Sequence, residues 1–191
     1  MVICMFMLVE LQDVVRIPPQ EFGKPLKTIV EEILKRKYES MIIPELGYII
    51  WLSHTKPDPT GKVVPGDGAS FHHVVFSVLT FYPKIQEVVE GEVVEVTDFG
   101  AFVRIGPTDS LLHISQIIDD YVTSDTKRGV ITASQTKRTL KVGSNIRARI
   151  TAVSLSRGES IGKIGITCRQ QYLGALEWIE EDVKKEAKSA G

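Results

Sequence analysis

The stretch TDFGAFVRIG, residues 97–106, carries aromatic and basic side chains at a spacing that could bind nucleic acid. Phe99 and Phe102 stand three apart around Gly100, although residues on one face of a strand are normally two apart. A β-bulge at Gly100, with a positive φ, would bring both rings to the side of the sheet that Arg104 occupies. Exposed rings beside a guanidinium offer stacking surfaces for bases and attraction for phosphate. The spacing alone equally allows both rings to fill a barrel interior.

Positive charge gathers in the second half of the chain, although the formal net charge of the 191 residues is only -1. Residues 84–126 contain two basic and nine acidic residues, whereas residues 127–169 contain ten basic and one acidic. The basic block coincides with predicted strands. We therefore expect a surface of concentrated positive charge, of the kind that attracts nucleic acid.

The segment NIRARITAV within this block is a predicted strand with arginines on one side. Its two-residue period directs Arg147 and Arg149 outward and three apolar side chains inward, those of Ile146, Ala148 and Ile150. Arg157 and Lys163 flank the turn before the next strand, a loop that oligonucleotide-binding barrels commonly use for contacts. Such residues contact phosphate without reading base sequence, so binding should weaken as salt rises.

From residue 84 onward, short strands and turns follow one another. The predicted strands are 88–97, 99–106, 110–114, 145–155 and 161–168. Five short strands predict an all-β barrel of the oligonucleotide-binding kind. The polar stretch 115–143 is an insertion between the third and fourth strands, and residues 171–188 carry apolar side chains at the spacing of a closing C-terminal helix.

The N-terminal part predicts a separate, small α+β domain. Residues 20–40 carry apolar residues at helical spacing, which predicts one amphipathic helix that begins near Pro25. Strand candidates lie around it at 6–16, 46–53 and 71–82. We therefore expect an N-terminal domain over residues 1–83 and a barrel domain over residues 84–191.

No group of residues forms a recognisable catalytic set, metal site or cofactor site. Asp119, Asp120 and Asp125 could together bind magnesium, but an acidic surface loop explains them more simply, and no nucleophile or general base accompanies them. His72 and His73 are adjacent on a predicted strand, so we expect one packed and one exposed ring. The two cysteines lie far apart without zinc-type spacing, so neither a disulfide framework nor a zinc site is expected.

The apolar runs of the chain are too short to cross a membrane. The longest, such as VVFSVLTF, fall far short of the roughly 18 to 20 residues that a spanning helix needs. The N-terminal stretch is apolar but lacks the basic region and cleavage site of a signal peptide. We expect a cytoplasmic protein with no membrane partner, for which Met5 is an alternative start to Met1.

The segments GEVVEVTDFGAFVRIG and LLHISQI resemble the RNA-binding domain first described in ribosomal protein S-one. The resemblance implies an RNA surface lined by two aromatic rings, a histidine on the third strand and a basic residue near the last strand. In this sequence those positions are Phe99, Phe102, His113 and Arg169. Ser110 departs from the pattern, since a glycine usually precedes the two leucines.

Over residues 8–178 the chain resembles the E-prime family, which is the larger stalk subunit of archaeal DNA-directed RNA polymerase. The segments ELQDVVRIPPQEFG, FYPKIQEVVEGEV and KIGITCRQQYLG carry this resemblance. It implies a non-catalytic protein whose N-terminal tip domain docks on the polymerase core and pairs with the smaller stalk subunit, and whose barrel meets the single-stranded transcript. The alternative is another protein with an S-one domain, such as an exosome cap or translation-initiation subunit.

Overall fold

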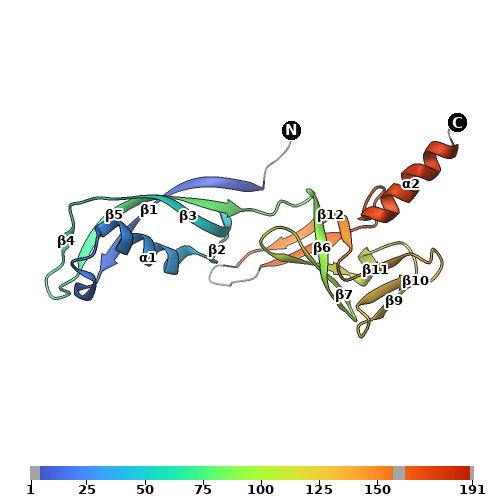
Figure 1. Cartoon of the computed structure of the whole chain (residues 1–191), viewed down its shortest axis with the longest axis horizontal. Helices are drawn as coiled ribbons and strands as arrows, with labels where there is room; N and C mark the ends of the chain where they lie inside the picture. The colour runs from blue at the N-terminus through green and yellow to red at the C-terminus, as the bar shows by residue number, and fades with distance from the viewer. Residues whose placement is uncertain (1–4, 157–161, 190–191) are drawn as a thin grey trace. The chain divides into compact units, whose positions relative to one another are not determined.

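The structure is a computed structural model that describes residues 5–156 and 162–189. Its chain divides into two compact units (Figure 1). We call them the N-terminal unit, which comprises residues 5–82 together with residues 155 and 156, and the barrel unit, which comprises Pro83–Ser154 and residues 162–189. Among the described residues, no helix is long and apolar enough to cross a membrane.

The N-terminal unit is an antiparallel sheet with a helix on one face. Its strands are β1 (Phe6–Ile17), β2 (Ile42–Ile43), β3 (Gly47–Pro57), β4 (Lys62–Val63) and β5 (Ser70–Phe81). They follow the order β1-β5-β3-β2, and β4 pairs with β5. The 3-10 turn η1 (Pro19–Glu21) and the helix α1 (Leu26–Tyr38) connect β1 to β2. The helix begins directly after Pro25, and the predicted α+β architecture is confirmed.

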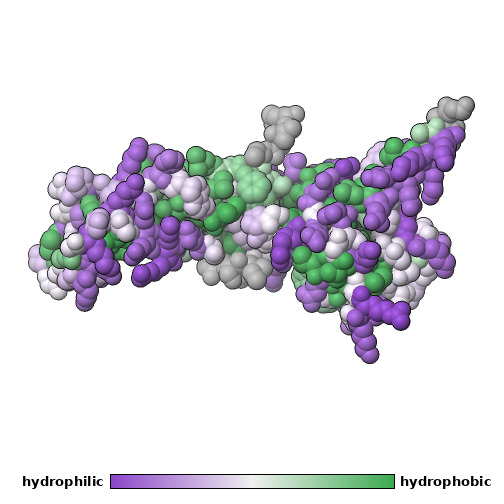
Figure 2. Space-filling view, viewed as in Figure 1, coloured by the Kyte–Doolittle hydropathy of each residue, from purple (hydrophilic) through white to green (hydrophobic). Residues whose placement is uncertain are grey.

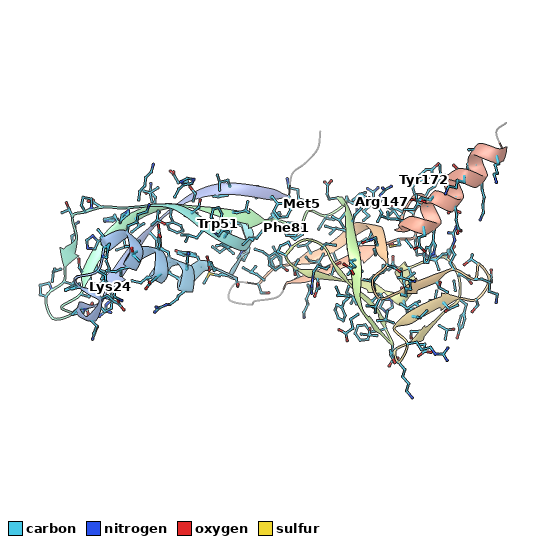
Figure 3. The ribbon with its side chains drawn as sticks, in the orientation of Figure 1. Met5, Lys24, Trp51, Phe81, Arg147 and Tyr172 are labelled. Carbon is cyan, nitrogen blue, oxygen red and sulfur yellow. The ribbon has the colours of Figure 1, made fainter. Side chains whose placement is uncertain are left out.

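The core of this unit lies between α1 and one face of the sheet. Ile29, Val30 and Leu34 of α1 are buried against apolar residues of three strands. Since successive strand residues point to opposite faces, the other face also receives apolar side chains. Those that remain exposed there are Phe6, Leu8, Val14 and Trp51 (Trp51 is labelled in Figure 3). We call these four residues the outer apolar face.

The two adjacent histidines take opposite environments, as predicted. His72 is buried, and its ring nitrogens lie 2.6 Å from the hydroxyl oxygen of Ser70 and 2.8 Å from the carbonyl oxygen of Asp58. The ring of His73 is exposed on the other side of β5. The buried ring therefore has a polar partner at each nitrogen and ties β5 to the loop before β4.

The barrel unit confirms the predicted five-stranded barrel. Its strands are β6 (Val88–Thr97), β7 (Gly100–Arg104), β8 (Asp109–His113), β12 (Asn145–Ser154) and β13 (Lys163–Thr167). Neighbouring strands pair in the order β13-β8-β7-β6-β12, and an additional pairing of β13 with β12 closes the ring. Only the β13–β8 pair is parallel among these described strands.

Alternate side chains of the barrel strands fill its interior. On β12, Ile146, Ala148 and Ile150 are buried while the arginines between them face outward, as the sequence predicts. Buried residues of the other strands complete this core, among them Val93, Val103, Leu112 and Ile166. The period of two thus determines which side chains can reach a ligand on the outside.

The predicted polar insertion forms a sheet of its own. After η2 (Ile114–Gln116), the strands β9 (Val122–Asp125), β10 (Val130–Ala133) and β11 (Thr139–Lys141) pair in the order β11-β10-β9. Ile131, Ala133 and Leu140 are buried on its inner side. These few apolar residues alternate with polar ones, which explains why the segment as a whole reads as polar.

A short strand and a helix end the chain. β14 (Gly174–Ala175) pairs with β12, and α2 (Leu176–Ser189) follows. The helix therefore begins later than the predicted span of residues 171–188. Arg138 ties the insertion sheet to α2, because its guanidinium forms an ion pair with Asp182 and lies 5.6 Å from the ring centroid of Trp178.

Asp13 of β1 joins the sheet of the N-terminal unit to the end of α1. Its carboxylate accepts hydrogen bonds from Lys37 Nζ at 2.6 Å and from the Tyr38 hydroxyl at 2.9 Å. Burial raises the pKa of Asp13, but these hydrogen bonds outweigh burial, so its pKa lies below the ordinary value. The stability that the ionised carboxylate contributes is present above the unfolded pKa and is lost as the pH falls through the folded pKa.

We expect Asp13→Asn to lower the free energy of unfolding at pH 7 by about 1 kcal/mol, because the variant keeps the shape and loses the charge. The difference from the unaltered chain should shrink at a pH below the lowered folded-state pKa of Asp13, where the native carboxylate also becomes protonated. Denaturant unfolding at both pH values, followed by circular dichroism, measures this. An equal difference at the two pH values would contradict the assignment.

Candidate nucleic-acid interface

The hairpin between β6 and β7 positions the two phenylalanines. Thr97 pairs with Gly100, so Asp98 and Phe99 form the turn that joins the strands. The predicted bulge at Gly100 is therefore wrong. The irregularity in this strand pair lies on β6, where the register shifts between Val93 and Glu95. Phe99 is a turn residue, and this is why the spacing of three does not follow the strand period.

Gly100 has a different reason to be glycine. Its φ is +155°, and a Cβ at this position would collide with the carbonyl oxygen of Leu112 on the neighbouring strand β8. The backbones of β7 and β8 approach closely here, which only a residue without a side chain allows. This approach brings the hairpin turn against the end of β8.

The two phenylalanine rings form an exposed pair on the outside of the barrel. Their centroids are 6.2 Å apart and their planes are 89° to one another, an edge-to-face contact. Phe99 is 49% exposed, and Phe102 is half-buried between the buried residues Ala101 and Val103. The alternative in which both rings fill the barrel interior is therefore wrong. A ligand can meet the Phe99 ring and the part of Phe102 that lines a neighbouring hollow.

His113 lies on the same outer surface. It is the cross-strand partner of Gly100, and its exposed ring holds Nδ1 2.8 Å from the Ser115 hydroxyl and accepts a hydrogen bond from the Ser115 amide at 3.2 Å. These contacts fix the ring with Nε2 directed away from Ser115. We call Phe99, Phe102 and His113 the aromatic face.

A hollow of about 700 Å³ lies beside Phe102. Its wall includes Leu111 of β8, Ala152 of β12 and Gly165 of β13, residues that pair with one another across the closed barrel. Sequence reasoning missed all three. The sequence signal that could have indicated the hollow is Gly165 within the apolar strand KIGIT. A glycine inside a strand often marks a site that a ligand approaches closely.

Three arginines predicted to contact RNA each face a carboxylate. Arg104 Nε donates to Asp109 at 2.9 Å, and this hydrogen bond raises the pKa of Arg104. Arg147, labelled in Figure 3, donates to Glu90 at 2.7 Å from the neighbouring strand β6. Arg169 is exposed and forms an ion pair with Asp119. The acidic and basic segments of the chain therefore meet in pairs, and these three residues do not form the concentrated positive surface that we expected.

The three other predicted basic contacts differ from one another. Arg149 is half-buried and donates from Nη1 to the carbonyl oxygen of Gln86 at 3.1 Å, and its buried Nε has no hydrogen-bond partner among the described residues. Lys163 is exposed and lines the hollow. Arg157 lies outside the residues that the structure describes. Of the two described residues, Lys163 is the one that lines the hollow.

The acidic residues that could have bound magnesium have separate partners. Asp119 forms the ion pair with Arg169, and Asp125 lies 3.7 Å from the Arg128 guanidinium. Asp120 accepts hydrogen bonds from backbone amides of the β10–β11 turn, and the Thr136 amide is the main cause of its lowered pKa. Within residues 5–156 and 162–189, no three potential ligands gather at a metal site.

A closed five-stranded barrel with outward aromatic rings, preceded by an α+β unit, places the chain among two-unit proteins with a barrel of the oligonucleotide-binding kind. The sequence matches two corresponding families: residues 82–165 match the S1 RNA binding domain, and residues 12–68 match the SHS2 domain found in the N terminus of Rpb7p/Rpc25p/MJ0397.

Curated relatives extend this match to nearly the whole chain. DNA-directed RNA polymerase subunit Rpo7 of Saccharolobus shibatae is 42% identical over 94% of this chain and 100% of its own length. Rpo7 of Sulfolobus acidocaldarius is 39% identical over 96% of this chain and 100% of its own length. RNA polymerase II subunit RPB7 of Saccharomyces cerevisiae is 26% identical over 90% of this chain and 100% of its own length. The chain belongs to the Rpo7 family of accessory, non-catalytic RNA polymerase subunits, which confirms the resemblance to the larger stalk subunit.

We expect Gly100→Ala to lower the free energy of unfolding of the barrel unit by about 2 kcal/mol or more, because the added Cβ meets backbone that cannot move aside. Gly165→Ala is the matched control, since its Cβ would have its nearest neighbours at 3.5 Å, an ordinary contact. In a Trp51→Phe background, Trp178 is the sole tryptophan, and its fluorescence reports the unfolding of this unit. Equal stability of the two alanine variants would refute the close-approach argument.

Proposed function

We propose that this chain binds the single-stranded RNA transcript through the aromatic face and the adjoining hollow, as a non-catalytic stalk subunit of RNA polymerase. The observation that carries the proposal is the exposed edge-to-face pair of Phe99 and Phe102 beside His113. Flat rings stack on any base, so they suit a protein that meets transcripts of every sequence. The match to the S1 RNA binding domain and the names of the polymerase relatives support this proposal.

The ion pairs decide how the charged residues contribute. A phosphate that approaches Arg104, Arg147 or Arg169 competes with the carboxylate that already faces each of them. Exposed ion pairs of this kind are weak, about 0 to 1 kcal/mol, so RNA can displace the carboxylates at modest cost. We therefore infer that stacking supplies most of the affinity and that the arginines guide the backbone.

We expect Phe99→Ala to weaken RNA binding by about 1 to 3 kcal/mol with little dependence on salt. The free energy of unfolding should change little, because the ring is half exposed and lies in a turn. RNA titrations at two salt concentrations, run beside denaturant melts, measure both quantities. Phe6→Ala is a matched control, because Phe6 is 44% exposed on the N-terminal unit. Unchanged RNA affinity in the folded Phe99→Ala variant would exclude the aromatic face.

The outer apolar face supports a second part of the proposal: the N-terminal unit pairs with the smaller stalk subunit and docks on the polymerase core. Leu8 is 66% exposed and Trp51 is 54% exposed. Leu8 on β1 and Trp51 on β3 flank β5 on the same face of the sheet. Exposed apolar residues on one face of a sheet are typical of protein interfaces, and a bound partner would stabilise this small unit by mass action. We further propose a cytoplasmic location, where a subunit of an archaeal polymerase would work.

We expect the double variant Leu8→Asp/Trp51→Asp to lose copurification with the smaller stalk subunit when both chains are expressed together. The introduced carboxylates would be buried without partners in the complex. Val63→Asp/Val64→Asp serves as a control, since these residues are exposed but lie at β4, away from the outer apolar face. Undiminished copurification of the Leu8→Asp/Trp51→Asp variant would show that the partner binds elsewhere.

The alternative function, that of an exosome cap or translation-initiation subunit, is disfavoured by the polymerase relatives that match over their full lengths. An exosome cap or translation-initiation subunit would share only the barrel with this chain. The N-terminal unit matches the SHS2 domain of polymerase subunits over residues 12–68, and this match separates the two possibilities.

A further inference from the structure

The insertion sheet, made of β9, β10 and β11, holds positive charge that is not neutralised. Residues 122–142 contain five basic residues and one acidic residue. Across the part of the chain that the structure describes, Lys127, Lys137 and Lys141 form no ion pair, and all three are exposed. Arg104, Arg147 and Arg169 of the barrel unit differ from these lysines, because each arginine forms an ion pair with a carboxylate. The insertion sheet therefore carries a group of three lysines whose charges can attract phosphate without displacing a carboxylate.

The lysines border a row of threonines on one side of the insertion sheet. The cross-strand register places Thr123, Thr132 and Thr139 side by side on the outer side of the sheet, and all three are exposed. Lys141 lies on the same side, one row nearer the β9–β10 turn that carries Lys127. Threonine hydroxyls and lysine ammonium groups both donate hydrogen bonds to phosphate and sugar oxygens. In Figure 2, hydrophilic side chains project from the end where β9 and β10 meet.

An exposed aromatic ring stands at the other end of this surface. Tyr121 directly precedes β9 and is 76% exposed. The two-residue period places it on the same side as Thr123. Its carbonyl oxygen accepts a hydrogen bond from the Ser134 amide at 2.8 Å, so it lies beside the β10–β11 turn that carries Lys137. An exposed ring and a lysine at the same end of a sheet can bind single-stranded nucleic acid by stacking and phosphate attraction.

The surface is held in place by contacts below it. Asp120 accepts hydrogen bonds from the Gln135 and Thr136 amides and so fixes the β10–β11 turn. Arg138 fastens the next strand to α2 through Asp182. A preformed surface loses less entropy on binding than a mobile one.

We propose that the outer side of the insertion sheet is a second binding surface for single-stranded RNA, which Tyr121, the threonine row and the three lysines contact. This inference rests on the proposed function, because it extends the RNA beyond the aromatic face. RNA fits the surface better than a protein does, since protein interfaces have apolar centres and few lysines. This surface offers hydroxyls, ammonium groups and a single ring; Val130, its one aliphatic residue, is half-buried, and its one carboxylate, Asp125, lies 3.7 Å from the Arg128 guanidinium. Its contacts would hold the sugar–phosphate chain without reading base sequence.

The test titrates the full chain with two RNAs of unstructured sequence. One has about 6 nucleotides, within the range that a single barrel binds, and the other has about 20. We expect the triple variant Lys127→Ser/Lys137→Ser/Lys141→Ser to bind the short RNA as the unaltered chain does. For the long RNA, the slope of log affinity against log salt should become less steep by about 2, because each lost phosphate contact contributes about 0.7.

Two matched controls isolate the surface. Lys35→Ser/Lys56→Ser/Lys62→Ser removes the same charge from exposed lysines of the N-terminal unit and should leave the slope for the long RNA unchanged. Tyr121→Ala should weaken binding of the long RNA about tenfold at every salt concentration, whereas Tyr121→Phe, which retains the ring, should bind normally.

The outcomes separate this proposal from the one on which it depends. If the long RNA keeps its affinity and slope in the insertion-sheet variants, the second surface is refuted while the aromatic face stands, and a protein partner becomes the better explanation of the lysines. If the control triple variant lowers the slope equally, overall charge is responsible and the proposal fails. If the unaltered chain binds neither RNA, both proposals fail together.

Discussion

Closure of the barrel is the constraint on which the rest of the structure depends. β13 pairs with β12 on one side and runs parallel to β8 on the other, so the five strands enclose one interior. That space is filled by residues such as Leu112, Ile150 and Ile166, and the period of two sends their neighbours outward. Phe102 and Leu111 are outside because Val103 and Leu112 are inside. The surface that we assign to RNA is thus a consequence of how the interior is packed.

Two glycines shape that surface in opposite ways. Gly100 lets the backbones of β7 and β8 approach, and this approach brings Phe99 and His113 to the same end of the barrel. Gly165 lines the hollow beside Phe102, and the side chain of a larger residue at this position would fill part of that hollow. One glycine therefore closes a gap between strands and the other leaves a space for a ligand. Neither role follows from the conformational freedom of glycine alone, since each depends on what lies across the strand.

Electrostatics in the barrel unit follow from strand pairing. β6 is acidic and β12 is basic, and their antiparallel pairing sets Glu90 opposite Arg147. The charge asymmetry along the chain is therefore largely cancelled within the barrel. Lys127, Lys137 and Lys141, which form no ion pair among the described residues, lie on the insertion sheet, whose strands pair with one another and not with an acidic strand. RNA that stacks on the aromatic face could thus extend to three unneutralised lysines on the insertion sheet.

The sequence by itself determined the features that depend on near neighbours in the chain: the five barrel strands, the helix after Pro25, the outward direction of Arg147 and Arg149, and the opposite faces of His72 and His73. These follow from the periods of strand and helix and from the fixed φ of proline. Tertiary structure decided the bulge on β6, the ion pairs, the hollow at Gly165 and the fold of the insertion. Each of these depends on the register between strands distant in sequence, and a single strand's own pattern does not specify its partner.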